Sequence, residues 1–360
     1  MTYNWTIEEQ EKLPLKKYTY GTTFSGAGGT SLGLEYLNRF QNVFYNELDR
    51  KQSTLYNLNL HPKYSFDMPI QELLNEDLSD KPEMFDLDVL QASPPCSLFS
   101  ASNLKADSMK GVESDKFSCA ESAGHCQIID ELYQPAIELC GKLQPKVFII
   151  ENVVGMTFKK NKIYIDDIYA RLDKLGYTTM HKVVKGEDIG LPQKRNRVFF
   201  VAVRSDVDFN NFNLSFNEPR VLIKDIKYTD EPTRPLTEHK LNVLKYYKYK
   251  DKDCGKINER VFGKRTGFST NLPIFDEDTF NTITTKLDSN IIVMKIDNGF
   301  TFMPPTQQQL IQAQSFPLDY NFNNRSVYYA LGMSVAPLMI AKIVEKVEEE
   351  ILEPFYNKGK

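Results

Sequence analysis

Cys96 stands in a setting that suits a nucleophile. It follows two prolines in Ser93-Pro94-Pro95-Cys96, after the apolar run Val89 to Ala92, which is typical of a buried strand. Proline fixes φ and lacks an amide N–H, so the two prolines end the strand and stiffen the turn. A thiol is therefore held at the carboxyl end of a strand, where open α/β sheets bind ligands. A small inert thiol is the alternative, and this stretch alone leaves both open.

Charged side chains border two further strand-like runs. Lys146 to Ile150 is a short apolar run that leads into Glu151-Asn152-Val153. A carboxylate at such a strand end can exchange a proton with a substrate. Gln193-Lys194-Arg195-Asn196-Arg197 precedes the apolar run Val198 to Val203. Strand alternation predicts that Arg195 and Arg197 point to one side, although a basic cluster can also be a solvated surface.

A glycine-rich loop near the N-terminus predicts a ligand that contacts the backbone. Tyr18 to Phe24 has the β-branched and aromatic composition of a strand, Ser25 to Gly33 is rich in glycine, and a helical pattern follows from Leu32. A strand, a glycine loop and a helix start in this order let a backbone approach a ligand closely. The loop does not match G-x-G-x-x-G, so a plain dinucleotide site is not supported.

Acidic residues follow the next two strand-like runs. Glu47 comes after Asn42 to Tyr45 and lies 21 residues beyond Gly26. An acid about 20 residues past such a loop commonly accepts hydrogen bonds from ribose hydroxyls. Asp67 follows Tyr64 to Phe66 and marks the tip of a third predicted strand. The loop and the acid together favour an adenosine-type ligand.

Composition excludes several classes of protein. The chain has 360 residues, 41% hydrophobic and 26% charged, with a net charge of −4. These values are typical of a globular protein, and no apolar run approaches the roughly 20 residues that span a bilayer. The N-terminus lacks the apolar stretch of a signal peptide, and five scattered cysteines do not form a disulfide framework. We therefore expect a protein of a reducing cytoplasm.

Two regions of different character follow one another along the chain. Strand and helix patterns alternate up to about Asp206 and return in Leu338 to Leu352, whereas 218–300 has short strand candidates and turns. This predicts an α/β catalytic and cofactor-binding domain at 1–215, completed by 318–360. A smaller, irregular, β-leaning domain is predicted at 216–317.

The smaller domain has a basic segment. Between Arg220 and Arg265 there are 13 Lys/Arg and 7 Asp/Glu, interleaved with tyrosines. Basic segments with aromatic residues suit a phosphate backbone, and a solvated surface is the alternative.

Taken together, these motifs resemble the DNA cytosine-5 methyltransferase family, from about Thr22 to Val347. The resemblance rests on motifs in the family's order: the cofactor loop Phe24-Ser25-Gly26-Ala27-Gly28-Gly29, Ser93-Pro94-Pro95-Cys96, Glu151-Asn152-Val153, Gln193-Lys194-Arg195-Asn196-Arg197, Gln314-Ser315-Phe316-Pro317 and Gly332-Met333-Ser334-Val335. It implies a Rossmann-like doubly wound domain that uses S-adenosylmethionine. Thr22 and Met333 depart from the family's usual residues.

The resemblance also implies a site. Four residues would be catalytic: Cys96, Glu151, Arg195 and Arg197. The cofactor would be bound by Phe24, Ser25, Gly26, Gly28, Gly29, Glu47, Leu48, Asp67, Met68, Pro94, Ser334 and Val335. No metal is implied.

The implied reaction gives each catalytic residue a role. The Cys96 thiolate would add to C6 of cytosine, and Glu151 would hydrogen-bond or protonate N3. Arg197 would bind the O2 side of the base, while Arg195 would position the loop and stabilise the thiolate.

The target base would flip out of a duplex, 97–127 would close over it, and 218–305 would contact the groove. Four cations are candidate phosphate contacts: Arg220, Lys224, Lys240 and Lys264.

The expected partner is duplex DNA with a cytosine-containing site. A restriction endonuclease would be a functional partner only, and a monomer is expected. The same chemistry on transfer RNA is the nearest alternative, and one branch of the family has that substrate. A nucleotide-binding oxidoreductase and a DNA-binding module without catalysis are weaker alternatives.

Overall fold

The computed structural model describes most of the chain. It covers residues 4–12, 17–95, 117–120, 125–128, 132–207, 212–226, 235–249, 251–264, 272–285 and 290–358, with backbone alone for 117–120 and 125–128. Contacts divide the chain into two compact units. The large unit is Ile7–Val184, Asn196–Ser215 and Met339–Lys360, and the small unit is Met1–Thr6, Lys185–Arg195 and Phe216–Leu338. Segment 318–338 thus groups with the small unit, whereas the sequence pattern assigned it to the first domain.

The large unit is built on a seven-stranded sheet. Its strands are β1 (Tyr18–Thr23), β2 (Phe40–Asn46), β3 (Tyr64–Phe66), β4 (Val89–Ala92), β7 (Val147–Val153), β8 (Tyr177–Lys185) and β10 (Asn196–Arg204). Their order is β3-β2-β1-β4-β7-β10-β8. The pairs among β3, β2, β1, β4 and β7 are parallel, and β10 runs antiparallel to β7. The strand order reverses between β1 and β4, and ligands of open α/β sheets bind at such a reversal.

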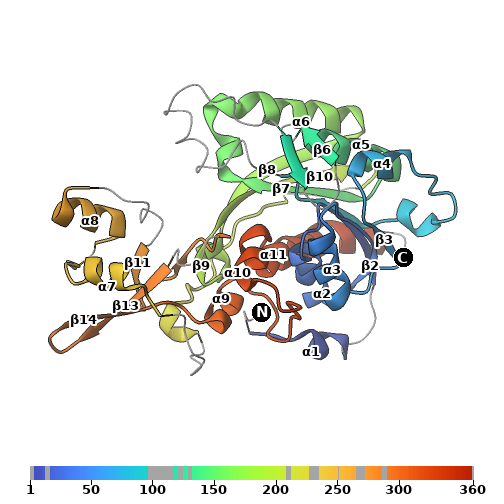
Figure 1. The fold of residues 1–360 in the computed structure, drawn as a ribbon. Coiled ribbons are helices and arrows are strands. Elements are labelled where there is room, and N and C mark those ends of the chain that lie inside the picture. The colour runs from blue at the N-terminus through green and yellow to red at the C-terminus, as the bar shows by residue number, and fades with distance from the viewer. Residues whose placement is uncertain are drawn as a thin grey trace. The chain divides into compact units, whose positions relative to one another are not determined.

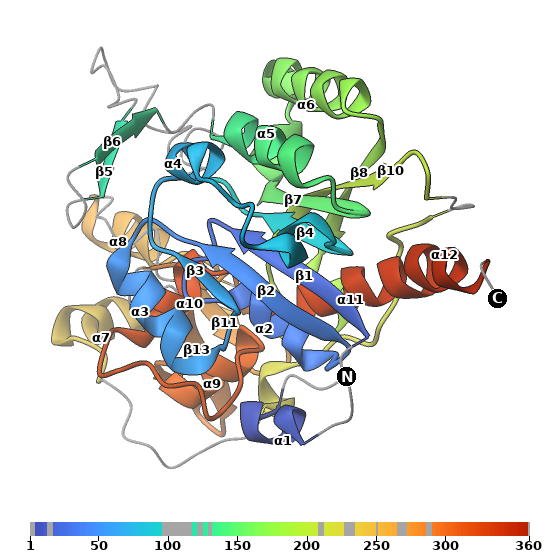
Figure 2. The ribbon, with the colours of Figure 1, turned by 90° about the vertical axis from the view of Figure 1, so that its right-hand side faces the viewer.

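Helices cover both faces of this sheet (Figures 1 and 2). One face carries α2 (Gly29–Tyr36), α3 (Arg50–Asn59) and most of α11 (Pro337–Val347), and the other carries α4 (Ile70–Asn75), α5 (Tyr133–Leu143) and α6 (Lys162–Lys174). The apolar face of α5 and α6 buries Leu139 and Leu172 against Phe148 of β7 and Phe200 of β10. The predicted doubly wound α/β fold is therefore confirmed.

The remaining described α-helices and β-strands of the large unit are short. They are α1 (Ile7–Glu11), the strands β5 (Phe117–Ala120) and β6 (His125–Ile128), and α12 (Glu353–Asn357). By length and composition the stretch Val327–Asn357 could cross a membrane, but 72% of its apolar window is buried inside the structure. Such burial is typical of a core helix.

In its described residues, the small unit combines short strands with four α-helices. Its strands are β9 (Gln193–Lys194), β11 (Leu272–Phe275), β12 (Phe280–Asn281), β13 (Asn290–Ile296) and β14 (Gly299–Met303). The sheet order is β11-β13-β14, and β12 pairs with β9. The helices are α7 (Glu238–Leu244), α8 (Cys254–Phe262), α9 (Gln307–Ala313) and α10 (Val327–Met333).

Two of these helices, α7 and α8, were not predicted from the sequence pattern. Each begins at a capping residue: the Thr237 hydroxyl accepts from the amide of Lys240, and the Asp253 carboxylate accepts from the amide of Gly255. Both helices are too short to show a clear hydrophobic repeat, so periodicity did not predict them. Their capping residues were the signal in the sequence that could have done so.

Candidate active site

The carboxyl end of β4 delivers the proline turn to the point where the strand order reverses. All four residues of β4 are buried, and Ser93 donates its amide to the carbonyl of Thr23 at the end of β1. The carbonyl of Pro94 accepts a hydrogen bond from Nδ2 of Asn152 at 3.4 Å. Cys96 lies outside the described residues, as does most of the predicted closing loop 97–127. The turn that leads to Cys96 is thus fixed between β1 and β7.

The predicted residues Glu151 and Arg197 form an ion pair. Nε of Arg197 lies 2.8 Å from Oε1 of Glu151, and the two side chains are 15% and 9% exposed. The antiparallel register pairs Glu151 with Phe199, so Arg197 is a diagonal neighbour on the same face of the sheet. Among the described residues, Oε2 of Glu151 has no hydrogen-bond partner. That oxygen can accept a hydrogen bond from, or give a proton to, a polar ligand.

Arg195 has a different environment from Arg197. It lies between β9 and β10, and its guanidinium donates to the carbonyl oxygens of Ile283 and Ser334 at 3.2 and 2.5 Å within the small unit. The premise of a single strand through Arg195 and Arg197 is wrong, because β9 ends at Lys194 and β10 begins at Asn196, so strand alternation does not relate the two side chains. In this position Arg195 braces two backbone segments of the small unit.

Gln193 is a second brace that the sequence motif contains but to which we assigned no role. Its Nε2 donates to the carbonyl of Ala313 at 2.8 Å and to the side chain of Gln314, and its Oε1 accepts from the amide of Ile283. Gln314 in turn donates to the carbonyl of Ser334 at 2.9 Å. Residues 193–195 of the first motif are therefore joined to the motifs at 314–317 and 332–335 by side-chain hydrogen bonds inside the small unit.

We expect Arg195→Met to destabilise the small unit. It leaves the carbonyl groups of Ile283 and Ser334 without this buried donor, which costs about 2–4 kcal/mol and lowers the melting temperature by roughly 5–10 °C. Lys194→Met is the control, because it removes only a half-exposed ion pair with Asp278, worth about 1 kcal/mol or less. Thermal unfolding followed by circular dichroism measures both variants. Equal melting temperatures for the two would contradict the bracing role.

The glycine loop is tied to the tip of β2 through Glu47. Oε2 of Glu47 accepts from the amide of Gly26 at 2.7 Å, and Oε1 accepts from the amide of Asp49 at 2.7 Å. Burial raises the pKa of the Glu47 carboxyl, while the two amides act in the opposite direction. Each oxygen keeps a further lone pair, so the carboxylate can also accept from hydroxyl groups of a ligand.

Backbone geometry explains the glycines of this loop. Gly28 has φ +85°, and a Cβ there would lie 2.5 Å from Cδ1 of Leu60. Gly26 has φ +53°, and a Cβ there would meet no atom within 4 Å, so the space beside it is open. Phe24 also has a positive φ, of 53°. Gly26 thus brings the backbone to an open space, whereas at Gly28 both the positive φ and the contact with Leu60 exclude a side chain.

The hydroxyl of Thr22 at the end of β1 supports the glycine loop, because its Oγ1 lies 2.8 Å from Oγ of Ser25.

Asn46 is a residue that the sequence reasoning missed. Its Nδ2 donates to the carbonyl oxygens of Phe66 and Met68, which joins the ends of β2 and β3. Its position immediately before Glu47 at a strand end was the available signal.

The other predicted cofactor residues divide between the units. Asp67 follows β3 in the large unit, and its Oδ1 accepts from the hydroxyl of Tyr45. Leu48 and Met68 are partly buried beside Glu47 and Asp67 in the chain. Ser334 and Val335 belong to the small unit and are buried. Gly29 begins α2.

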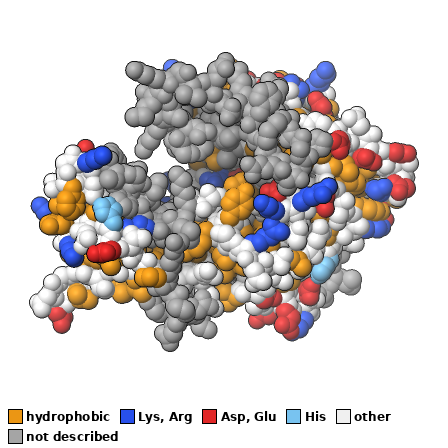
Figure 3. Space-filling model, viewed as in Figure 1, with side chains coloured by type: hydrophobic (Ala, Val, Ile, Leu, Met, Phe, Trp, Pro, Cys, Tyr) orange, Lys and Arg blue, Asp and Glu red, His pale blue; other side chains and the backbone are white. Residues whose placement is uncertain are grey.

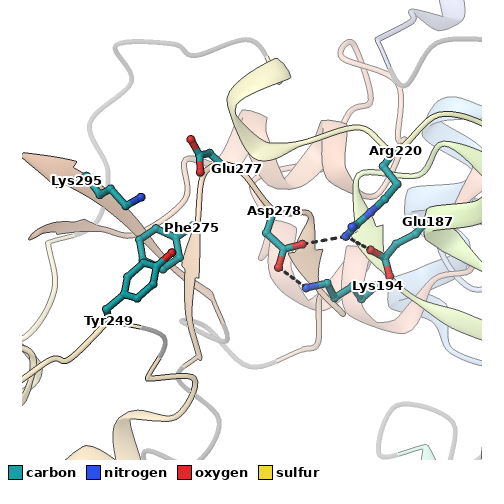
Figure 4. A pocket seen from close by; sticks show the side chains of 8 residues that line it. All are labelled: Glu187, Lys194, Arg220, Tyr249, Phe275, Glu277, Asp278 and Lys295. Carbon is teal, nitrogen blue, oxygen red and sulfur yellow. Dashed lines mark hydrogen bonds and ion pairs between the residues drawn. The ribbon is translucent and has the colours of Figure 1, made fainter.

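The small unit has a polar pocket of its own, of about 500 Å³ (Figure 4). Asp278 lies at its centre, paired with Lys194 at 2.7 Å and with Arg220 at 3.0 Å, and Arg220 also pairs with Glu187. Arg220 is therefore held by two carboxylates. Lys240, a second predicted phosphate contact, is buried. Lys224 and Lys264 are exposed, as a phosphate contact requires.

Cations and apolar side chains also share the visible face of α7, α8 and the β13–β14 hairpin (Figure 3). Exposed aromatic residues in and after α7 and in α8 include Tyr246, Tyr249 and Phe262. The combination suits a phosphate backbone with exposed sugar and base surfaces.

Comparisons with known proteins agree with this architecture. A family model of C-5 cytosine-specific DNA methylases matches residues 18–349. The Type II methyltransferase M.Bsp6I of Bacillus sp. (strain RFL6) is 26% identical over 341 residues, which are 91% of this chain and 98% of that protein. The Type II methyltransferase M.BsuFI of Bacillus subtilis is 26% identical over 357 residues, covering 98% of this chain and 78% of that protein.

A solved structure shares the fold. A DNMT2 mutant of Spodoptera frugiperda is 13% identical, with a TM-score of 0.62 over 92% of this chain and 99% of that chain. At this identity the likeness concerns the fold alone. The family model, in contrast, spans most of the sequence and both units, and on that ground the chain belongs to the family of C-5 cytosine-specific DNA methylases.

Proposed function

We propose that this chain methylates C5 of a flipped-out cytosine in a specific duplex DNA site, through a covalent adduct between Cys96 and C6. The observation that carries the proposal is the Glu151–Arg197 pair at the carboxyl end of β7. The register of β4 and β7 pairs Ala92 with Ile150, so the turn toward Cys96 and the carboxylate of Glu151 leave neighbouring strands at the same edge.

The reaction follows from the chemistry of these groups. Addition of the Cys96 thiolate to C6 forms a C–S bond and makes C5 enamine-like, while Glu151 protonates or hydrogen-bonds N3 so that negative charge does not build up on the ring. Arg197 orients Glu151 through its ion pair and binds O2 of the base. Once C5 has taken up the methyl group, loss of its proton to a base breaks the C–S bond and releases the thiolate of Cys96.

S-adenosylmethionine is the cofactor we propose, and when bound it supplies the electrophilic methyl group. The hydrogen-bond acceptors at the loop fit this molecule. Glu47 offers lone pairs to ribose hydroxyls, Asp67 offers an oxygen to an amino group, and the open space beside Gly26 leaves room for a ligand. The proposed cofactor set is completed by Phe24, Ser25, Gly28, Gly29, Leu48, Met68, Pro94, Ser334 and Val335.

The small unit is the proposed target-recognition region. Its exposed cations would contact phosphates, which position a duplex, and its aromatic and polar side chains would read the groove. The Type II relatives support a role in modification beside a restriction endonuclease. A monomer in the reducing cytoplasm suits a reaction that needs a free thiol.

Labelled methyl transfer tests the function directly. We expect the purified chain to transfer a tritiated methyl group from S-adenosylmethionine to duplex DNA and not to transfer RNA. Bisulfite sequencing of the DNA would then identify the methylated cytosine and its sequence context. If the tritium appeared in transfer RNA and not in DNA, the proposed substrate would be overturned. That outcome would favour the same chemistry on RNA.

A further inference from the structure

Tyr45 lies between Asp67 and Asn57 at the tips of β2 and β3. Its hydroxyl is 2.5 Å from Oδ1 of Asp67 and 2.6 Å from Nδ2 of Asn57. An amide nitrogen only donates, so the Tyr45 oxygen accepts from Asn57 and its own proton is directed to Asp67. Burial, and next the hydrogen bond to Asp67, raises the pKa of Tyr45, which keeps this hydroxyl protonated at neutral pH.

The position of Tyr45 is fixed by its surroundings. Its side chain is fully buried, and its ring stacks on that of Tyr56 with centroids 4.0 Å apart and planes at 17°. The hydroxyl of Tyr56 is itself held by Ser31 at 2.7 Å and by Asn42 at 2.9 Å. A rigid, buried tyrosine therefore reaches out to a carboxylate at the surface, because Asp67 is exposed.

This arrangement leaves the Asp67 carboxylate half occupied. Oδ1 accepts from Tyr45, and within the described residues Oδ2 has no hydrogen-bond partner. An exposed aspartate ordinarily rotates freely, but a bond from a buried donor holds the carboxylate and so fixes the direction of its second oxygen. A preorganised acceptor favours a ligand that has a donor at that one place.

We propose that Tyr45 is a positioning residue that orients Asp67 to accept the amino group of adenine, so that the site discriminates between purines of the methyl donor. The inference rests on the proposed function of Asp67 in cofactor binding and adds a specificity determinant within β2. Asn57 supports it by polarising the Tyr45 hydroxyl toward Asp67.

Tyr45→Phe tests the inference, because it removes the hydroxyl and keeps the ring that stacks on Tyr56. Isothermal titration calorimetry would measure binding of S-adenosylhomocysteine and of its inosine analogue, which has a carbonyl in place of the amino group. We expect wild type to prefer the adenine ligand by about tenfold or more. In Tyr45→Phe the adenine ligand should bind about 5- to 10-fold more weakly while the inosine ligand changes little, so the preference collapses.

Tyr133→Phe is the matched control. Tyr133 is also buried and also donates to a carboxylate, Oδ2 of Asp167 at 2.7 Å, but on helices α5 and α6. The Tyr133→Phe variant should bind S-adenosylhomocysteine and its inosine analogue with unchanged affinity. Equal weakening of both ligands in Tyr45→Phe would reveal a merely structural role and overturn the inference.

Asp67→Asn separates this inference from the function on which it rests. If Asp67→Asn loses the preference while Tyr45→Phe retains it, Asp67 reads the base without help from Tyr45 and the inference fails alone. If wild type binds neither ligand, the proposed cofactor fails and the inference fails with it.

Discussion

Cys96→Ala abolishes methyl transfer, with a single-turnover rate at least about 10³-fold below wild type. Alanine cannot form the bond to C6, so C5 stays a poor nucleophile. The free cysteines Cys140 and Cys254 cannot take over, because burial raises the pKa of each thiol to about 12 and keeps it protonated. DNA affinity should stay within about twofold, since the substitution removes only one sulfur atom from a small side chain.

Rapid-quench assays with labelled S-adenosylmethionine and fluorescence anisotropy with duplex DNA measure the two properties separately. Cys140→Ala is the control for loss of a thiol. It lies in the core at 0% exposure, so it should lower stability by about 1 kcal/mol through a small cavity and leave the rate unchanged. Full activity in Cys96→Ala would refute the covalent mechanism.

Glu151→Gln is the second large effect, with a single-turnover rate about 10²-fold or more below wild type. The amide can still hydrogen-bond the base, but it cannot deliver a proton to N3. The substitution also removes the charge that faces Arg197, whose side chain is only 15% exposed. The structure therefore predicts a loss of stability as well as a loss of rate, and the two must be measured apart.

Glu348→Gln provides the matched comparison. Glu348 is 3% exposed and pairs with Arg39 in the same unit, with Nη2 at 2.5 Å. Both variants remove a buried carboxylate that pairs with an arginine and should lose about 1–3 kcal/mol of stability. Arg39 is 42% exposed and Arg197 only 15%, so Glu348→Gln should lie toward the lower end of that range. Only Glu151→Gln should slow the chemistry when rates are compared well below both melting temperatures. Equal rates in the two variants would remove Glu151 from the reaction.

Local patterns in the sequence predicted most of the strands that carry the site. β1, β2, β4, β7 and β10 each overlap a run that was predicted as a strand, because a buried strand is rich in apolar, β-branched and aromatic residues whatever its neighbours are. The residues that follow these runs, Glu47, Asp67 and Glu151, lie at carboxyl ends of strands for the same reason. The order of motifs likewise sufficed to recognise the family, which the match over residues 18–349 confirms.

Local patterns did not predict which segments of the chain pack together in each unit. The sequence pattern of segment 318–338 gives no sign of its neighbours, yet Ser334 within it accepts hydrogen bonds from Arg195 and Gln314 of the small unit. Helices α7 and α8 share a small core with Ile291 of β13, and short helices of this kind depend on tertiary packing more than on periodicity.

The sequence alone thus determined that Cys96 follows a stiff turn, that acidic residues stand at strand ends, and that the sheet is doubly wound. Only the tertiary structure decided which of those side chains are partners. It pairs Arg197 with Glu151 through the antiparallel register of β7 and β10, commits Arg195 to carbonyl groups of the small unit, and directs the Tyr45 hydroxyl to Asp67. The physical reason is that strand periodicity fixes the face on which a residue lies, whereas hydrogen bonds and ion pairs join residues tens or hundreds of positions apart.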